Sequence, residues 1–159
     1  MDKQTFADQV MAKEQTLYRV ARSMLARDED CKDALQEAVT RAWAARHTLK
    51  EERFFATWLT RILINVCKAM RTKQGKYLLF SAVQAEAVPC TPQSSIRDML
   101  SGLPEKQRLP VVLHYIEGYS LKEVSAMLRI PQSTLRGRLY HARQALRLAL
   151  DETEEVHMQ

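Results

Sequence analysis

The sequence predicts an all-α protein of two small helical domains joined by a flexible linker, with a helix-turn-helix domain as the second. Apolar residues such as Phe6, Val10 and Leu17 recur at helical spacing, and similar spacing resumes in the second half. No segment alternates like a half-buried strand, and no Asn-Gly or Asp-Gly hairpin turn occurs. The central stretch 77–95 contains "SAVQAEAVPCTPQSS", with two prolines, small residues and a single charge, which is typical of a linker.

The first predicted domain covers residues 1–76 and consists of helices. Acids cluster at the start of the segment 28–47, which suits a helix N-terminus. A later helix should begin near residues 52–56 and end at about Thr72, because Gly75 offers a stop. In the segment 28–47 one apolar stripe is expected, formed by Ala34, Leu35, Ala38, Val39, Ala42 and Trp43.

The stretch "FFATWLTRILINVCK", residues 54–68, carries two stripes on that later helix. The predicted core stripe is formed by Phe55, Leu59, Ile62, Leu63, Val66 and Met70. A second stripe beside it is formed by Trp58, Arg61, Asn65 and Lys68. An aromatic ring beside Arg, Asn and Lys could stack on an unpaired base and hold phosphates. Taken alone, the stripe fits better a tryptophan partly tucked into the core beside solvated charges, and Phe54 could serve either side.

The second predicted domain covers residues 96–150, followed by an acidic tail, 151–159. "IRDMLSGL" forms one short amphipathic segment. The next helix has Pro104 near its start and Gly118 near its end. Pro110 lies inside this helix and predicts a kink or a late start.

The segment "GYSLKEVSAMLRIPQSTLRGRLYHARQAL" predicts the helix-turn-helix. Ser120 and Glu123 fit a capping box ahead of a short helix, residues 121–128. The turn follows, and Pro131 suits the first turn of a second helix. That helix should bury Leu135, Leu139, Ala142 and Leu146.

The face opposite this core is polar, basic and free of acids, as a helix in the DNA major groove requires. It is formed by Ser133, Gly137, Tyr140 and Gln144, with Arg136, Arg143 and Arg147 on one flank and Thr134 and His141 on the other. Gly137 at its centre costs about 1 kcal/mol relative to Ala, which close approach to DNA would justify and drift at a surface position would also explain. An ordinary helical hairpin is the less favoured interpretation, because the capping box, the proline turn and the basic face coincide.

Net charge, cysteine pattern and the lack of enzyme motifs limit the classes of function that the sequence allows. The net charge is +5, and two acid-free basic segments, 61–76 and 129–147, suggest two contacts with a polyanion. Cys31, Cys67 and Cys90 form no CxxC pair, and the polar start is unlike a secretory signal, so we expect a reduced, cytoplasmic protein. No glycine-rich phosphate loop, HExxH or GxSxG motif occurs, so we expect no enzyme activity, catalytic residue, metal or cofactor.

The chain resembles a bacterial RNA polymerase sigma factor of the extracytoplasmic-function (ECF) type. The resemblance is carried by "DALQEAVTRAW", "FFATWLTRILINV" and "LPEKQRLPVVLHYIEGYSLKEVSAMLRIPQSTLRGRLYHARQAL", which follow the family's order and approximate spacing. It implies a transcription initiation factor whose residues 1–76 are sigma region 2 and whose residues 96–150 are sigma region 4. Its implied partners are core RNA polymerase, promoter DNA and an anti-sigma factor, commonly at the membrane, with no small-molecule substrate.

The resemblance also implies the roles of individual residues. The minus-ten element would be melted and held by Lys50, Arg53, Phe54, Trp58, Arg61, Asn65, Lys68 and Arg71. The minus-thirty-five element would be read by Gln132, Ser133, Thr134, Arg136, Gly137, Arg138, Tyr140, His141 and Arg143. The polymerase would be contacted by Asp33, Gln36 and Glu37.

Pro110, Val39 and the "LINV" at 63–66, where the family often has a small residue before the asparagine, depart from the family pattern in detail. The alternative function is a helix-turn-helix regulator with an N-terminal dimerisation domain, acting without being a sigma subunit. That alternative explains the second half but leaves the basic and aromatic first half without a role. The two functions differ in whether the protein lets core polymerase initiate at a promoter.

Overall fold

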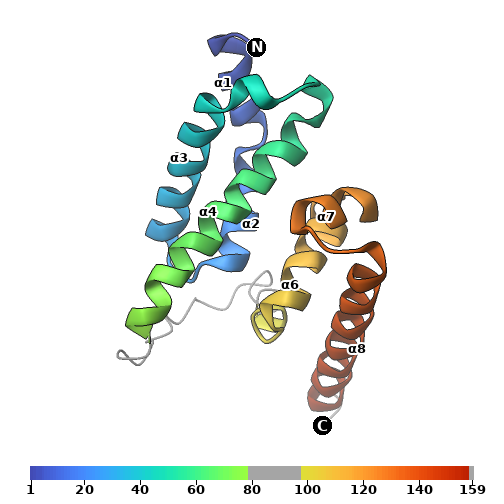
Figure 1. The fold of residues 1–159 in the computed structure, drawn as a ribbon. Coiled ribbons are helices and arrows are strands. Elements are labelled where there is room, and N and C mark those ends of the chain that lie inside the picture. The colour runs from blue at the N-terminus through green and yellow to red at the C-terminus, as the bar shows by residue number, and fades with distance from the viewer. Residues whose placement is uncertain (79–97, 158–159) are drawn as a thin grey trace. The chain divides into compact units, whose positions relative to one another are not determined.

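The computed structural model describes residues 1–78 and 98–157, and these residues form helices and connecting turns without a β-strand (Figure 1). This confirms the predicted all-α class. The chain divides into two compact units, formed mainly before and after residue 84. The predicted linker lies outside the described residues except for positions 77 and 78, and Cys90 and Ile96 also lie outside them. Within the described ranges, no helix has the length and apolar character needed to cross a membrane.

The first unit is a helical bundle whose main contacts join α2, α3 and α4 to one another. Figure 1 shows α3 beside α4 along much of their length. The elements are α1 (Lys3–Ala12), α2 (Glu14–Met24), α3 (Asp28–Ala44), the 3-10 turns η1 (Arg46–Thr48) and η2 (Glu52–Phe54), and α4 (Phe55–Leu78).

The buried face of α3 is built from small residues. Ala34, Ala38 and Ala42 are almost fully buried at steps of four, with Cys31 one turn before them. Small side chains let α4 come close and fill the space with its own larger residues. Leu35, Val39 and Trp43, predicted on the same stripe, are half-buried at its border.

A side-chain hydrogen bond ties the start of α3 to α2. Tyr18 on α2 donates its hydroxyl hydrogen to the carboxylate of Asp28, the first residue of α3. This hydrogen bond, with that of Lys32, lowers the pKa of Asp28 below its usual value. The negative charge is therefore kept at the helix N-terminus, where the helix dipole favours it.

Helix α4 confirms most of the predicted core and corrects two details. Phe55, Leu59, Leu63 and Val66 are buried, whereas Ile62 and Met70 are only half-buried. Ile64 and Cys67 are fully buried, because α2 and α3 both pack on α4 and widen its apolar face. The helix also continues to Leu78, so the predicted stop near Thr72 and Gly75 is wrong.

In the second unit a helical turn at residues 98–101 precedes α6 (Glu105–Val111), η3 (Val112–Ile116), α7 (Leu121–Leu128) and α8 (Gln132–His157). Pro110 lies inside α6, and the helix continues as a π-helix, η3, in which the Glu117 amide donates to the Val112 carbonyl at 2.9 Å. The proline thus causes neither a late start nor an end of the helix. Gly118, with φ of 79°, then turns the chain towards α7.

The helix-turn-helix forms as predicted around α7. The Ser120 amide donates to the Glu123 carboxylate at 3.3 Å, and the Glu123 amide donates to the Ser120 hydroxyl at 3.1 Å, which is the predicted capping box. Pro131 stands one residue before α8 rather than within its first turn, and its carbonyl accepts from the Leu135 amide at 3.1 Å. The backbone of α8 continues to His157, past the predicted domain end at residue 150.

The core of the second unit is shared by α6, η3, α7 and α8. Leu135, Leu139 and Ala142 are buried as predicted, and Leu146 is half-buried. Other buried residues of this unit include Leu103, Leu109, Val111, Val112, Leu113 and Val124, and Met127 and Leu128 of α7 are also buried. One face of α8 is therefore fixed against the unit, and the opposite face is left to solvent.

Candidate nucleic-acid interface

The outward face of α8 is the first candidate surface. Burial of Leu135, Leu139 and Ala142 directs the intervening side chains to solvent. Gly137 and Arg138 are half-buried. The exposed members of the predicted set are Gln132, Ser133, Thr134, Arg136, Tyr140, His141 and Arg143.

Among the described side chains, this face is positively charged. Arg136, Tyr140, Arg143 and Arg147 are all exposed and follow one another at steps of four, three and four along α8. Residues 132–148 include no acid. Among the residues that the structure describes, no recorded salt bridge involves these arginines. The stripe therefore offers guanidinium groups to an external anion.

Gly137 lies within the same face, and protein packing does not require it there. Apart from the glycine itself, its two chain neighbours and the adjacent backbone of α8, a Cβ atom added at this position would have no atom within 4 Å. The missing side chain is thus not explained by a close neighbour within the described protein.

One contact of this face was not predicted. Arg143 Nη1 donates to the hydroxyl oxygen of Tyr115 at 2.6 Å, joining α8 to η3 across 28 positions. Sequence reasoning missed Tyr115 because it lies outside the helix-turn-helix motif. Neither helical spacing nor charge pattern connects the two residues.

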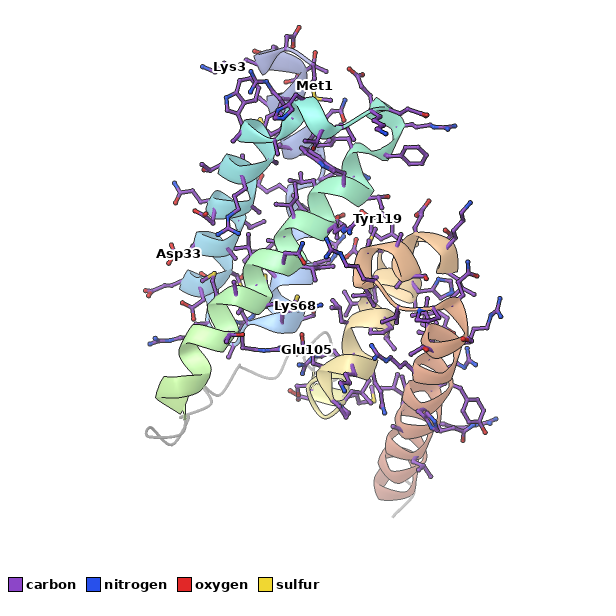
Figure 2. All side chains as sticks on the ribbon, viewed as in Figure 1. Met1, Lys3, Asp33, Lys68, Glu105 and Tyr119 are labelled. Atoms are coloured by element: carbon purple, nitrogen blue, oxygen red, sulfur yellow. The ribbon has the colours of Figure 1, made fainter. Side chains whose placement is uncertain are left out.

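The second candidate surface is the polar stripe of α4. Trp58 and Arg61 are half-buried, and Asn65 and Lys68 are exposed, so the stripe borders the core as predicted. Figure 2 shows Lys68 on this helix. Arg71, one turn beyond Lys68, is half-buried.

A chain of aromatic rings holds Trp58 in place. The ring of Phe6 from α1 packs edge-to-face on Trp43 and on Phe55, with centroids 5.1 and 5.6 Å away. Phe55 in turn contacts Trp58, at 5.9 Å. The indole of Trp58 is therefore anchored on one side while part of it stays accessible. This geometry satisfies both interpretations of Trp58, as a core neighbour and as a stacking surface.

The loop before α4 presents a further aromatic side chain. Phe54 is 47% exposed, so its ring is not part of the buried core. The Arg53 guanidinium lies over its ring, 4.6 Å from the centroid, and also pairs with Glu51. Lys50 is exposed between η1 and η2. A similar stack that sequence reasoning missed places Arg46 over Trp43, at 3.9 Å.

The exposed face of α3 is acidic and lies on the same unit. Asp33, Gln36 and Glu37 are all exposed, and Figure 2 shows Asp33 on the outer side of α3. Glu37 pairs with Arg41 one turn later, at 2.7 Å. The structure thus brings the three residues predicted for a protein partner onto one helix face.

The thiols of the first unit are poor candidates for chemistry. Cys31 and Cys67 are free and buried. Burial raises the pKa of Cys67 to about 12 and also raises the pKa of Cys31. Both thiols are therefore protonated at neutral pH and lack the nucleophilic form. In the described ranges, no group of three or more His, Cys, Asp or Glu side chains could hold a metal ion.

Comparison with known proteins gives matches in both units. The family model for sigma-70 region 2 matches residues 10–77, and the model for sigma-70 region 4 matches residues 93–146. The ECF RNA polymerase sigma factor SigW of Bacillus subtilis is 30% identical, over 94% of this chain and 90% of that protein. The ECF RNA polymerase sigma-E factor of Escherichia coli is 28% identical, over 74% of this chain and 72% of that protein.

Two solved structures resemble this protein over most of its chain. CnrH, solved in complex with the cytosolic domain of CnrY, is 26% identical and superposes with a TM-score of 0.74, over 95% of this chain and 90% of that chain. The sigma factor RpoE from Bartonella quintana, solved with the anti-sigma factor NepR, is 21% identical with a TM-score of 0.79, over 92% of this chain and 97% of that chain. The second likeness concerns the fold.

Proposed function

This chain belongs to the ECF sigma factors of bacterial RNA polymerase and so directs the polymerase to specific promoters, and we propose how its surfaces divide that work. The polymerase performs the chemistry of RNA synthesis, and we infer that this chain contributes no catalysis of its own. Its contribution is recognition of promoter DNA and of the core enzyme.

We propose that α8 reads the minus-thirty-five element in the major groove. The observation that carries this assignment is the exposed, acid-free face of α8, with its stripe of Arg136, Tyr140, Arg143 and Arg147. Arginine can bind guanine bidentately, and short polar groups such as Ser133 and Thr134 can reach base edges or phosphates. The buried face of the helix locks the register in which these side chains are presented.

We propose that α4 and the loop before it open the minus-ten element. Opening a duplex exposes unstacked bases, which aromatic side chains can hold by stacking. Trp58 and Phe54 supply accessible rings, and Asn65 supplies an amide for hydrogen bonding. Phosphates of the opened strand would be met by Lys50, Arg53, Arg61, Lys68 and Arg71.

We propose that α3 docks on the core polymerase through Asp33, Gln36 and Glu37. These side chains are exposed on one face of a helix whose other face is packed into the bundle. An acidic surface suits a protein partner because it would repel the phosphates of DNA.

We also propose an anti-sigma factor as a partner that holds the chain inactive. CnrH, which is similar to this chain, was solved with the cytosolic domain of CnrY, and RpoE was solved with the anti-sigma factor NepR. Attachment of such a partner to the membrane is part of the same proposal and follows from the resemblance to the family.

A selection experiment tests the division between the two units. Core polymerase with this protein would be mixed with random duplexes, and the bound DNA would be sequenced. We expect two enriched elements, and transcription should start downstream of the minus-ten element. If the protein bound duplex DNA as a dimer and gave no initiation with core polymerase, the alternative helix-turn-helix regulator would be favoured.

A further inference from the structure

The hydrogen bond between Arg143 on the outward face of α8 and Tyr115 joins a charged donor to a neutral acceptor. Arg143 donates to the Tyr115 oxygen at 2.6 Å, whereas an acidic partner would cancel its charge. Tyr115 is 50% exposed and Arg143 is also exposed. The pair therefore carries a full positive charge at the surface while its geometry is restrained.

The hydrogen-bonding capacity of the pair points to an external acceptor. A phenol has one O–H donor and two acceptor positions, and Arg143 uses an acceptor position. Within the described part of the chain, no acceptor is recorded for the Tyr115 hydroxyl hydrogen. A guanidinium has five N–H donors, and the single bond to Tyr115 leaves others for a second partner. Donors from both residues are thus available side by side, next to a positive charge.

The ring of Tyr115 also contacts its neighbour in the chain, His114. His114 packs on it edge-to-face with centroids 4.9 Å apart, and His114 Nδ1 is 2.7 Å from the Tyr119 carbonyl oxygen. Both residues belong to the π-helix η3. π-Helices are rare and occur frequently at functional sites, where they redirect side chains. Tyr115 is therefore pre-organised from the η3 side, and Arg143 is restrained by Tyr115.

We propose that Tyr115 and Arg143 form a clamp for one backbone phosphate of duplex DNA. In this clamp the phenol O–H and the free guanidinium N–H groups donate to the phosphate oxygens, and the Arg143–Tyr115 bond sets their spacing. A phosphodiester offers several acceptor oxygens and a negative charge, which matches the donors and the charge of the pair. The inference rests on the proposed role of α8 in binding the minus-thirty-five element.

The alternative is a tether that only holds η3 to α8. Exposed side-chain contacts of this kind contribute little to stability, since water competes for both partners. A tether and a clamp also differ in what they predict. Loss of a tether lowers the melting temperature and leaves DNA affinity unchanged, whereas loss of the clamp lowers DNA affinity in protein that is still folded.

The experiment compares holoenzymes assembled from core polymerase and full-length wild-type, Tyr115→Phe, Arg143→Ala or doubly substituted protein. Two fluorescent duplexes serve as probes, one with the selected promoter elements and one with the minus-thirty-five element scrambled. Affinity is measured at several salt concentrations for the assembled fraction of each protein. Tyr18→Phe is the matched control, because it also removes a hydroxyl that bonds to a charged side chain, but in the first unit.

We expect Tyr115→Phe to weaken binding by about three- to tenfold, the usual effect of one lost hydrogen bond. The loss should be equal on both duplexes, since a phosphate carries no sequence information. Arg143→Ala should weaken binding further and reduce the salt slope by about one. The double variant should bind nearly as Arg143→Ala does, because the two side chains act as one unit.

Two results would overturn the clamp alone. One is that wild-type holoenzyme selects the promoter duplex and Tyr115→Phe binds it with wild-type affinity, whatever its melting temperature. The other is full additivity of the two substitutions. If the wild-type holoenzyme showed no preference between the duplexes, the proposed role of α8 would fail together with the clamp.

Discussion

At the scale of single residues, the outward face of α8 includes residues with low helix propensity. Ser133, Thr134 and Gly137 are weaker helix formers than the alanines and leucines on the buried side. They occupy exposed or half-exposed positions, where packing does not select them. Helix stability therefore does not account for these residues, whereas the DNA contacts proposed for this face would.

Gly137→Ala separates stability from DNA binding. The added methyl group would meet open space, so we expect the unfolding free energy to rise by about 1 kcal/mol, the usual difference in helix propensity. If DNA approaches this position closely, affinity for the minus-thirty-five duplex should fall in the same variant. Thermal unfolding and holoenzyme binding to that duplex provide the two measurements.

A stabilised Gly137→Ala variant with unchanged affinity would contradict close approach and favour drift at a surface position. Ala126→Gly is a suitable control for the stability measurement. Ala126 is exposed within α7, and the reverse substitution should lower stability by about 1 kcal/mol.

The buried thiol of Cys67 predicts a pH dependence on the alkaline side. Its pKa is raised from 9.0 to about 12 by burial, so the unfolded chain loses this proton at lower pH than the folded protein does. The contribution of this thiol to the unfolding free energy is therefore fully present below pH 9. It is lost as pH rises from 9 towards 12, by at most about 1.4 kcal/mol per pH unit. Chemical denaturation at pH 8 and pH 10 measures the loss.

Cys67→Ala should make the alkaline decrease of the unfolding free energy with pH less steep, although it also removes some buried volume. The comparison is therefore between slopes rather than between absolute stabilities. An identical slope in the variant and the wild-type protein would mean that other groups cause the alkaline loss.

At the scale of elements, local chemistry decided which predictions succeeded. The bounds of α7 were predicted correctly, because the capping box of Ser120 and Glu123 lies within four consecutive residues. The end of α4 was not, because one glycine inside a helix costs only about 1 kcal/mol and Gly75 is therefore a weak stop. The π-helix after Pro110 was not predicted either, since the proline signal indicates a disturbed helix without fixing how it continues.

The turn between α7 and α8 contains a residue whose backbone strain a substitution can relieve. Arg129 has φ of 55°, a left-handed conformation that costs a side-chain-bearing residue about 1–2 kcal/mol. Glycine adopts this conformation freely but loses more entropy on folding. We expect Arg129→Gly to raise the unfolding free energy by about 0.5 to 1 kcal/mol, measured by chemical denaturation.

Arg129→Ala provides the control, because it removes the same exposed charge and keeps a Cβ atom. It should not stabilise the protein. Equal gains in unfolding free energy in the two variants would show that removal of the Arg129 charge, rather than relief of its backbone conformation, stabilises the protein.

At the scale of the whole molecule, two basic surfaces were predictable and the contacts within them were not. The acid-free segments 61–76 and 129–147 are visible in the sequence, as is the helical spacing that turns Trp58 and Arg136 away from the core. The ring chain that holds Trp58 and the bond that holds Arg143 join residues far apart in the chain. Such contacts depend on tertiary packing, which periodicity and charge counts do not encode.

Substitutions on the α8 surface and on the α4 surface should impair different steps of promoter use. Arg136→Ala should weaken holoenzyme binding to the closed promoter duplex by about 5- to 150-fold where a bidentate base contact is lost. Arg143→Ala should also weaken it, through the lost phosphate contact of the clamp. Trp58→Ala and Asn65→Ala should leave that binding largely intact and reduce promoter opening, since stacking on an unpaired base is worth a similar amount. Duplex affinity and the permanganate reactivity of exposed thymines measure the two steps separately.

A promoter with a premelted minus-ten bubble distinguishes the two groups of variants further. It supplies the unpaired bases in advance, so opening no longer has to be driven by the α4 surface. We expect the bubble to restore transcription by Asn65→Ala and, more weakly, by Trp58→Ala, because the stacking surface itself is missing in the latter. It should not restore binding by Arg136→Ala, whose defect lies in the duplex. If all four substitutions lowered only the melting temperature, both surfaces would belong to the scaffold, and the assignment of α4 and α8 to promoter DNA would be wrong.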